Sequence, residues 1–398
     1  MSKAKLTDSL TFPSDLKVSR SLFVVSGVAL LASFVGYFIN SQQFFFSYLT
    51  SLIFVASLTL ASLFYVMLQH ITRSEYSVVF RRIPEVISAN MLWIAILFIP
   101  VMFGLHTLYE WTHHDVVAGS AALKWKSPWL KPGFFIIRNV IYFSIWTFLG
   151  VRLYRNSIKM DETGDWGLQT LLRRTSGPGM FLFAITVPFA AFDWVMSLDP
   201  HWYSTIFGVY FFAMSFQAFF PVLILLSLYL RKRGILTNTI TEKHISDMGL
   251  LTFAFTIFYA YIAFAQYLLI YYANVPEEVV WFQNHFAGNW VDLAWLILFG
   301  RFFVPFFGLI GTSPKKNMTY LKYMAIWILF MHFVELYWII MPTLHKSGLD
   351  IHWLDFTTLI GLICLILGIF FYRFSKHSMV AKNDPLLDRS LNKNKYPN

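Results

Sequence analysis

Charged residues are scarce in this sequence. Only 13% of its 398 residues are Asp, Glu, Lys or Arg, whereas a typical soluble domain carries about 25%. Hydrophobic residues make up 57% of the chain, and the mean hydropathy is +0.58. A water-soluble fold of this length cannot bury so much apolar surface, so the composition indicates an integral membrane protein.

Cysteine is almost absent too. The one cysteine, Cys364, lies in an apolar run, and a single thiol cannot build a disulfide, an iron–sulfur cluster or a cysteine-rich zinc site. The C-x-x-C-H signature of covalent haem c is missing from the sequence. The mid-membrane histidine, His332, has no second histidine at matching depth that would complete a pair of haem b ligands. We therefore expect neither a metal nor a cofactor in this chain.

Ten apolar segments are long enough to cross a bilayer, which takes roughly 20 mainly apolar residues. They are too long and too continuous for the alternating strands of about ten residues that build a membrane β-barrel. The segments are Ser21–Phe38, Phe44–Gln69, Val86–His106, Gly133–Leu153, Pro178–Leu198, Tyr203–Leu230, Gly249–Tyr272, Trp290–Ile310, Tyr320–Met341 and Phe356–Phe374. The sequence thus predicts an all-α, polytopic membrane protein with about ten transmembrane helices.

Lys and Arg are distributed very unevenly between the two sides of these helices. Of the 31 Lys and Arg residues, 25 fall in the N-terminal segment, in every second loop and in the C-terminal tail. Four fall on the other side, and the remaining two, Arg138 and Arg301, lie well inside predicted helices. Because Lys and Arg collect in the cytoplasmic loops of membrane proteins, we expect both termini in the cytoplasm. The same rule accounts for the net charge of +10 without a nucleic-acid partner.

The chain is expected to form one domain. Residues 1–20 are polar and lack the pattern of a cleaved signal peptide, so they should be a short cytoplasmic segment before the first helix. Residues 1–375 then make up a single transmembrane helical domain. The polar residues 376–398 should form a disordered cytoplasmic tail.

Ionisable side chains inside a bilayer are costly, so each is a candidate functional residue. Arg138 in the fourth helix and Asp193 in the fifth lie at similar depth and are candidates for an ion pair. Such a pair either holds two helices together or forms a proton-accessible site. The residues alone leave both readings open.

The ninth helix carries His332 and Glu335, which are three residues apart and therefore share one helical face. Burial can move the proton affinities of both groups toward neutrality, which permits a proton relay. The alternative is a hydrogen-bonded pair that locks the bundle. Arg301 in the eighth helix needs a partner of its own, and Pro305 one turn later is expected to open that helix locally.

The seventh helix has a polar stripe. Thr252, Thr256, Tyr259 and Gln266 recur on one helical face, where they would order either a water chain or a set of interhelical hydrogen bonds. The candidate proton path therefore comprises Asp193, His332, Glu335, Arg301, Tyr259 and Gln266.

Residues 192–205 read FDWVMSLDPHWYST and form the most distinctive stretch of the chain, a tight outer turn between the fifth and sixth helices. This stretch, together with the length and helix count, resembles the ActF-type integral membrane subunits of bacterial alternative complex III, a quinol:electron-acceptor oxidoreductase. ActF is in turn similar to the ActC subunit and to the NrfD/PsrC family of quinol-handling membrane anchors. The resemblance covers nearly the whole chain. It implies two four-helix bundles plus two peripheral helices, in the bacterial inner (cytoplasmic) membrane.

The resemblance also implies partners. These are an ActC-like membrane subunit, a multi-haem cytochrome c subunit and an iron–sulfur subunit, with a terminal oxidase as a further candidate, all among membrane lipids. Haem c and iron–sulfur clusters would belong to the partner subunits, and the complex would oxidise menaquinol or another quinol. This chain would be a non-redox subunit of a quinol:cytochrome c oxidoreductase, and it would offer a proton route.

Three functions follow from these observations. The first is a cofactor-free subunit that scaffolds the complex and lines a proton path. The second is direct quinol binding at the outer end of the fifth helix, where a carboxylate, a histidine and aromatic rings come together. The residues of that candidate quinol site are Asp193, Trp194, His201 and Trp202. The third is a secondary transporter, favoured by Pro100 and Pro305, which correspond in a five-plus-five division of the helices.

Overall fold

Helices make up nearly all of the computed structural model, which describes residues 8–13 and 17–391. Ten helical segments in this part of the chain are long and apolar enough to span a membrane. These same residues contain no β-strand. The prediction of an all-α, polytopic membrane protein is confirmed.

Two of the spanning segments, the third and the eighth, are divided into shorter helices. The first five spans are α1 (Val18–Ile39), α2 (Ser41–Thr72), the broken third span with α3 (Arg82–Ala89), α4 (Met91–Leu97) and α5 (Ile99–Phe103), α9 (Pro132–Thr163) and α10 (Gly167–Trp194). The sixth and seventh spans are α11 (Phe207–Lys232) and α12 (Glu242–Ala273). The broken eighth span consists of α14 (Trp290–Ile297), the π-helical turn η3 (Leu298–Phe303) and α15 (Val304–Ile310), and the last two spans are α17 (Met318–Ile340) and α18 (Trp353–Phe374). Shorter helices lie outside the spans and include α6 (Leu105–Leu108), α7 (His114–Gly119), α8 (Ala121–Lys126), α13 (Pro276–His285), α16 (Thr312–Lys316) and α19 (Leu387–Leu391).

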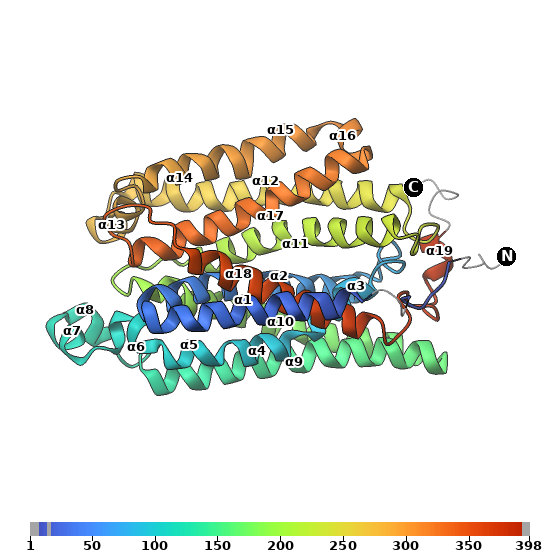
Figure 1. Cartoon of the computed structure of the whole chain (residues 1–398), viewed down its shortest axis with the longest axis horizontal. Helices are drawn as coiled ribbons and strands as arrows, with labels where there is room; N and C mark the ends of the chain where they lie inside the picture. Colours follow the sequence, from blue (N-terminus) through green and yellow to red (C-terminus); the bar gives the residue numbers. More distant parts are fainter. Residues whose placement is uncertain (1–7, 14–16, 392–398) are drawn as a thin grey trace.

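The spans pack as two four-helix bundles with two peripheral helices, as predicted. The second to fifth spans contact one another and form the first bundle, and the sixth to ninth spans form the second. In Figure 1 the two bundles lie one above the other, and α1 and α18 run together across the front. The α1–α18 pair packs against α2.

Helix α2 is the central element of the molecule. It contacts α10 of its own bundle, α11 and α17 of the second bundle, and the peripheral α18. Small hydroxyl residues such as Ser51, Ser57 and Ser62 are fully buried along it. Small side chains let neighbouring helices approach closely inside a membrane, so α2 can pack on several partners at once.

A proline follows a break in each of the two interrupted spans. The third span is interrupted at Phe98, two residues before Pro100. In the eighth span Pro305 follows the π-helical turn that contains Arg301. Proline has no N–H to bond the carbonyl four residues earlier, and its ring crowds that carbonyl. That carbonyl belongs to Arg301, so the helix widens where this side chain has to be placed.

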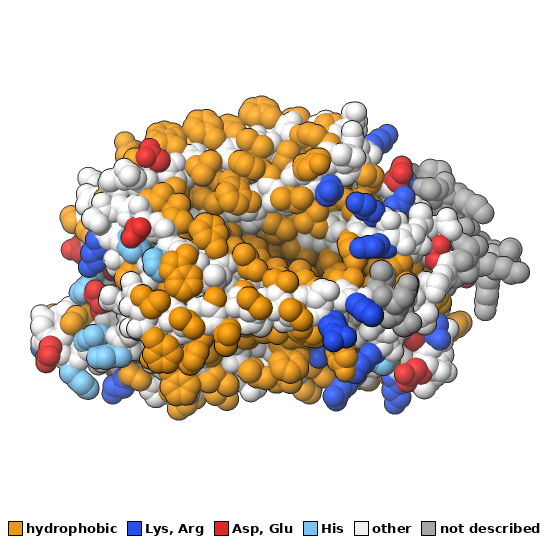
Figure 2. Space-filling view, viewed as in Figure 1, with side chains coloured by type: hydrophobic (Ala, Val, Ile, Leu, Met, Phe, Trp, Pro, Cys, Tyr) orange, Lys and Arg blue, Asp and Glu red, His pale blue; other side chains and the backbone are white. Residues whose placement is uncertain are grey.

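Lys and Arg side chains gather at one end of the molecule, which we call the basic end, while hydrophobic side chains cover the middle (Figure 2). Helix α19, the last described element of the chain, lies there as well (Figure 1). The expectation that the tail from Lys376 onward is disordered is wrong for residues 376–391. Met379, Val380 and Ala381 are fully buried, and the Met379 N–H donates to the carbonyl of Leu10 at 2.8 Å. The remaining residues, 392–398, lie outside the described part.

A buried ionic cluster ties this tail to the first bundle. The guanidinium of Arg82 contacts Glu85 at 2.8 Å and Asp161 at 2.5 Å, and its Nε donates to the carbonyl of Ser378 at 3.1 Å. The side chain of Asn383 donates to the Asp161 carbonyl at 2.8 Å. Arg82 is only 1% exposed, so its charge depends on these partners.

We expect Arg82→Ala to destabilise the protein by about 3–5 kcal/mol, because it leaves a buried carboxylate without its cation. It should also release the tail, which limited proteolysis in detergent would report as faster cleavage after residue 376. Arg152→Ala, an exposed change on α9, is the matched control and should leave both readings as in the parent protein. Equal cleavage in the two variants would contradict this role for the cluster.

Candidate functional site

In each bundle a buried Arg–carboxylate ion pair joins the third helix, which supplies the Arg, to the fourth, which supplies the acid. Arg138 of α9 pairs with Asp193 of α10 in the first bundle. Arg301 of η3 pairs with Glu335 of α17 in the second bundle. All four side chains are buried. The sequence analysis named Asp193 as the candidate partner of Arg138 and left Arg301 without a partner.

The first ion pair is fully matched by hydrogen bonds. Arg138 Nε and Nη2 donate to the two oxygens of Asp193, each at 2.8 Å. The Tyr142 hydroxyl donates to the same carboxylate at 3.0 Å, and Trp129 Nε1 donates to it at 3.2 Å. A carboxylate has about four acceptor positions, and four donors fill them here. This arrangement suits a structural link between α9 and α10.

The second ion pair belongs to a group of side chains that we call the Glu335 cluster: Tyr210, Tyr259, Arg301, His332 and Glu335. Oε1 of Glu335 accepts hydrogen bonds from the hydroxyls of Tyr210 and Tyr259, the latter at 2.6 Å. Oε2 lies 2.7 Å from Arg301 Nη1, but this is a charge contact without an aligned hydrogen bond. Oε2 of Glu335 therefore still has acceptor capacity among the described residues.

Arg301 is the centre of the Glu335 cluster, and none of it is exposed. Its Nη2 donates to the Met214 carbonyl at 2.9 Å, and its Nε donates to Gln217 Oε1 at 3.2 Å. The guanidinium carbon lies 4.6 Å from the centre of the Tyr259 ring, a distance at which the ring face attracts a cation. These contacts hold the guanidinium in place independently of Glu335.

The contacts of His332 fix its charge state. Its Nδ1 lies 3.0 Å from Nη2 of Arg301, and a guanidinium can only donate. Nδ1 must therefore accept, which makes the ring neutral and puts its proton on Nε2. That nitrogen lies 2.9 Å from the Ser57 hydroxyl, which in turn donates to the Phe54 carbonyl at 2.8 Å. His332 and Glu335 are thus linked through Arg301 and do not contact each other by any hydrogen bond among the described residues.

The polar stripe of α12 faces the interior of the second bundle. Thr252, Thr256, Tyr259 and Gln266 are all buried. Gln217 Nε2 donates to the Thr256 hydroxyl at 3.0 Å. From Thr252 to Gln266 the stripe extends over about 21 Å at 1.5 Å per residue, against a hydrocarbon core of about 30 Å. Oε1 of Gln266 is buried without a hydrogen-bond partner in the described part of the chain.

A cavity of about 880 Å³ lies beside the Glu335 cluster. Six residues with a hydroxyl, amide or carboxylate line it, namely Tyr210, Tyr259, Tyr261, Gln266, Tyr267 and Glu335. The other lining side chains are mostly apolar and aromatic, including Trp281, Phe282, Phe286, Trp295, Phe302 and Trp338. An apolar space of this volume with a few convergent polar groups is typical of sites for small ligands.

The structure does not gather the four candidate quinol-site residues into one pocket. Asp193 is committed to Arg138, and Trp194 Nε1 donates to Asn139 within the first bundle. Trp202 instead stacks on Trp281 of α13, with ring centres 4.6 Å apart. The last of the four, His201, is exposed in the connecting turn. Three of the four residues are therefore engaged in packing between helices.

A buried histidine beside the cavity, His285, was not singled out from the sequence. Its ring stacks on Trp281 with centres 3.6 Å apart, and its nitrogens lie 2.7 and 3.2 Å from the carbonyls of Trp281 and Ile339. Burial lowers the pKa of His285 to about 4, although the two carbonyl contacts raise it. The ring packs behind Trp281, which lines the cavity.

The sequence analysis also missed Tyr210, Gln217 and Ser57. A signal existed for two of them, because Tyr210 and Gln217 are seven residues apart on one face of α11, which is otherwise mainly apolar. Ser57 had no such signal, since it is one of many hydroxyl residues along α2.

Comparison with models of known protein families gave no match, and comparison with curated proteins gave none either. Within residues 8–13 and 17–391, no group of three or more His, Cys, Asp or Glu side chains is placed to hold a metal ion. The functional argument therefore depends on the geometry of the two ion pairs and the cavity.

We expect Asp193→Asn to destabilise the protein by about 3–5 kcal/mol, since Arg138 would stay buried without its carboxylate. Thermal unfolding in detergent would measure the loss. Asp199→Asn, in the following turn, is the control and should change the unfolding temperature little. The double change Arg138→Met and Asp193→Leu should recover part of the stability, because it removes both charges; no recovery would argue against a purely structural pair.

Proposed function

We propose that this chain is a membrane subunit of a quinol-oxidising respiratory complex of the alternative complex III type, in the bacterial inner membrane with both termini in the cytoplasm. In that complex it would carry no redox cofactor of its own. It would scaffold the cofactor-bearing subunits and conduct protons through its second bundle. The observation that carries the proton role is the Glu335 carboxylate, whose Oε2 faces a buried arginine without an aligned hydrogen bond.

The proposed proton step takes place at Glu335. A proton that binds Oε2 neutralises the carboxylate and weakens its contact with Arg301. The guanidinium stays charged in proteins, and it keeps its hydrogen bonds to Met214, Gln217 and His332. Its field then favours release of the proton and return of the ionised carboxylate. Arg301 therefore acts by its charge and does not pass the proton itself.

Polar groups extend from Glu335 toward both ends of the second bundle. Gln266 lies on the side away from the basic end, next to the cavity. Gln217, Thr256 and Thr252 continue from Arg301 toward the basic end. A proton route needs such groups along most of the membrane, with water completing it. Asp193 belongs to the other bundle and is left out of this route.

The secondary-transporter hypothesis receives less support. The two ion pairs repeat with an offset of four helices, because the fourth and fifth spans correspond to the eighth and ninth. A transporter built from two five-helix halves would repeat with an offset of five. The breaks near Pro100 and Pro305 do fit that offset. The buried polar network, however, lies within one bundle rather than between two halves.

Glu335→Gln should reduce proton movement by roughly tenfold or more, as expected when a general acid–base group is lost. The measurement is a pH-sensitive dye response during quinol oxidation by the purified complex in liposomes. Asp355→Asn is the matched control, because Asp355 is a buried intramembrane carboxylate bonded to Tyr337 and Gln43 and outside the cluster. If Glu335→Gln assembles and moves protons at the parent rate, the proton role is wrong and the scaffold role alone stands.

A second candidate function is direct quinol binding, and the cavity of about 880 Å³ favours it. A quinol has a polar ring head and an apolar tail. The head would meet Gln266, Glu335 and Tyr259, and the tail would lie among the aromatic side chains of α12 and α14–α15. Oε1 of Gln266 would accept a hydrogen bond from a quinol hydroxyl, which would give this buried atom a partner. On this proposal the quinol would bind in the second bundle and not at the outer end of α10.

An azido-quinone should label peptides from α12 and α14–α15 in the purified complex. Gln266→Leu should lower this labelling several-fold, since it removes the polar anchor. Gln283→Leu, an exposed change on the neighbouring α13, should leave it unchanged. Labelling confined to residues 193–202 would favour the site at the outer end of α10 and would rule out the cavity.

A further inference from the structure

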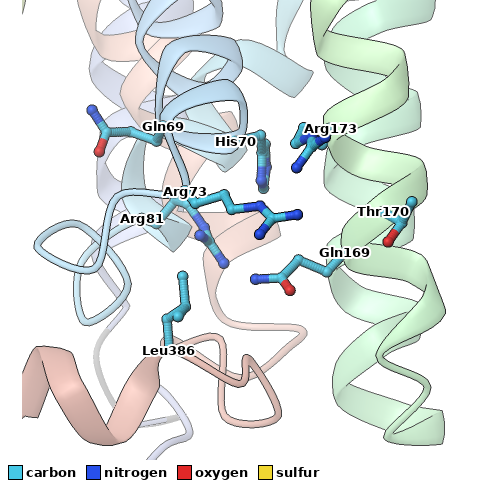
Figure 3. A pocket seen from close by; sticks show the side chains of 8 residues that line it. All are labelled: Gln69, His70, Arg73, Arg81, Gln169, Thr170, Arg173 and Leu386. Atoms are coloured by element: carbon cyan, nitrogen blue, oxygen red, sulfur yellow. The ribbon is translucent and has the colours of Figure 1, made fainter.

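A depression with many cationic and amide side chains lies at the basic end, away from the Glu335 cluster. It is bordered by the end of α2, the residue before α3, the start of α10 and the C-terminal segment (Figure 3). The lining residues that carry the argument are Gln69, His70, Arg73, Arg81, Gln169 and Arg173. In Figure 3 Arg73 and Arg81 extend toward Gln169 on the facing helix, while His70 and Arg173 approach from above.

The depression holds more positive than negative charge. Arg81 is compensated, because it pairs with Asp384 and lies 3.3 Å from Glu85. The exposed side chains of Arg73 and Arg173 have no ion pair or hydrogen-bond partner among the described residues. Two guanidinium groups thus converge on one small space without a protein anion between them.

Buried polar atoms in the same depression lack partners too. His70 is 5% exposed and Gln69 is 8% exposed. Nε2 of His70 and Oε1 of Gln69 have no hydrogen-bond partner in the described part of the chain. The nearest carboxylate oxygen to His70 Nε2 belongs to Glu85 and is 4.0 Å away, beyond hydrogen-bond distance. Buried polar atoms are normally satisfied, so His70 Nε2 points to a ligand that supplies a hydrogen-bond acceptor, whereas the Gln69 amide is turned away from the other lining side chains (Figure 3).

The backbone at Arg73 is unusual in the same place. This residue ends α2 with φ 51° and ψ 43°, in the left-handed region. Glycine is the usual residue at this position of a helix end, because a side chain is strained there. The side chain of Arg73 is directed into the depression (Figure 3), which suggests that it contacts a ligand there.

We infer that this depression binds a phosphate group, carried by an anionic lipid headgroup or by free phosphate. Guanidinium groups match phosphate oxygens in pairs and are favoured at such sites. The depression lies where α2 ends and α10 begins, which is where lipid headgroups meet the protein, and basic pockets between transmembrane helices at this level bind anionic headgroups. A phosphate oxygen between Arg73 and Arg173 would give both groups an anion, and a second oxygen would give His70 Nε2 an acceptor. This inference does not depend on the proposed function.

The test is a titration of the full-length protein in detergent with dioctanoyl phosphatidylglycerol, dioctanoyl phosphatidylcholine or inorganic phosphate, followed by thermal unfolding. In the double variant Arg73→Gln, Arg173→Gln, the ligand concentration needed for a given rise in unfolding temperature should increase at least about tenfold, because two charge-assisted contacts are lost. Its unfolding temperature without added ligand should match that of the parent, since both side chains are exposed. The double variant Arg155→Gln, Arg174→Gln is the matched control, with two exposed arginines of the same end outside the depression.

The ligand series separates the two sources. Stabilisation by phosphatidylglycerol that is lost only in the Arg73, Arg173 variant assigns the site to a lipid headgroup. Equal stabilisation by inorganic phosphate at similar concentration, lost in the same variant, assigns it to free phosphate. If every ligand acts alike on the two double variants, the depression is not a phosphate site and the inference is wrong.

Discussion

A charge inside an apolar bundle must have a partner, and the second bundle is organised around that requirement. Arg301 is wholly buried among five protein acceptors from α11 and α17. To place it there, the eighth span widens into a π-helical turn next to Pro305. The same requirement places Glu335 opposite Arg301. The hydroxyls of Tyr210 on α11 and Tyr259 on α12 donate hydrogen bonds to its carboxylate. One guanidinium therefore determines how four helices are turned toward one another.

The first bundle meets the same requirement in a different way, and the comparison separates structure from function. Four hydrogen bonds saturate Asp193, including both from Arg138. Glu335 has two hydrogen bonds on one oxygen and an unaligned contact on the other. Protonation of Asp193 would break a matched pair, whereas protonation of Glu335 would use free acceptor capacity. Equivalent positions in two similar bundles thus carry a structural link in one and a candidate proton site in the other.

The sequence predicted the architecture well because membrane spans follow from length and apolarity, which are properties of single segments. It predicted the facing of α12 for the same reason, since one helical face carries Thr252, Thr256 and Tyr259. Which side chains pair across helices was harder to predict from the sequence. The π-helical turn rotates Arg301 away from the direction that a regular helix gives it, so spacing alone could not pair it with Glu335. The tail was misjudged because a few apolar residues, Met379 to Ala381, order a mainly polar segment by packing against the basic end.

The two proposed roles of the second bundle meet at a single residue, Glu335. Oε2 of Glu335 faces Arg301 on one side, and Glu335 also reaches the wall of the cavity. A hydroxylated ligand in the cavity would compete with Arg301 for that carboxylate. Loss of a proton from such a ligand to Glu335 would weaken the ion pair, and the charge of Arg301 would then drive the proton onward along Gln217 and Thr256. In this arrangement ligand binding and proton transfer would not be alternatives, because the same carboxylate would be the ligand anchor and the first proton acceptor.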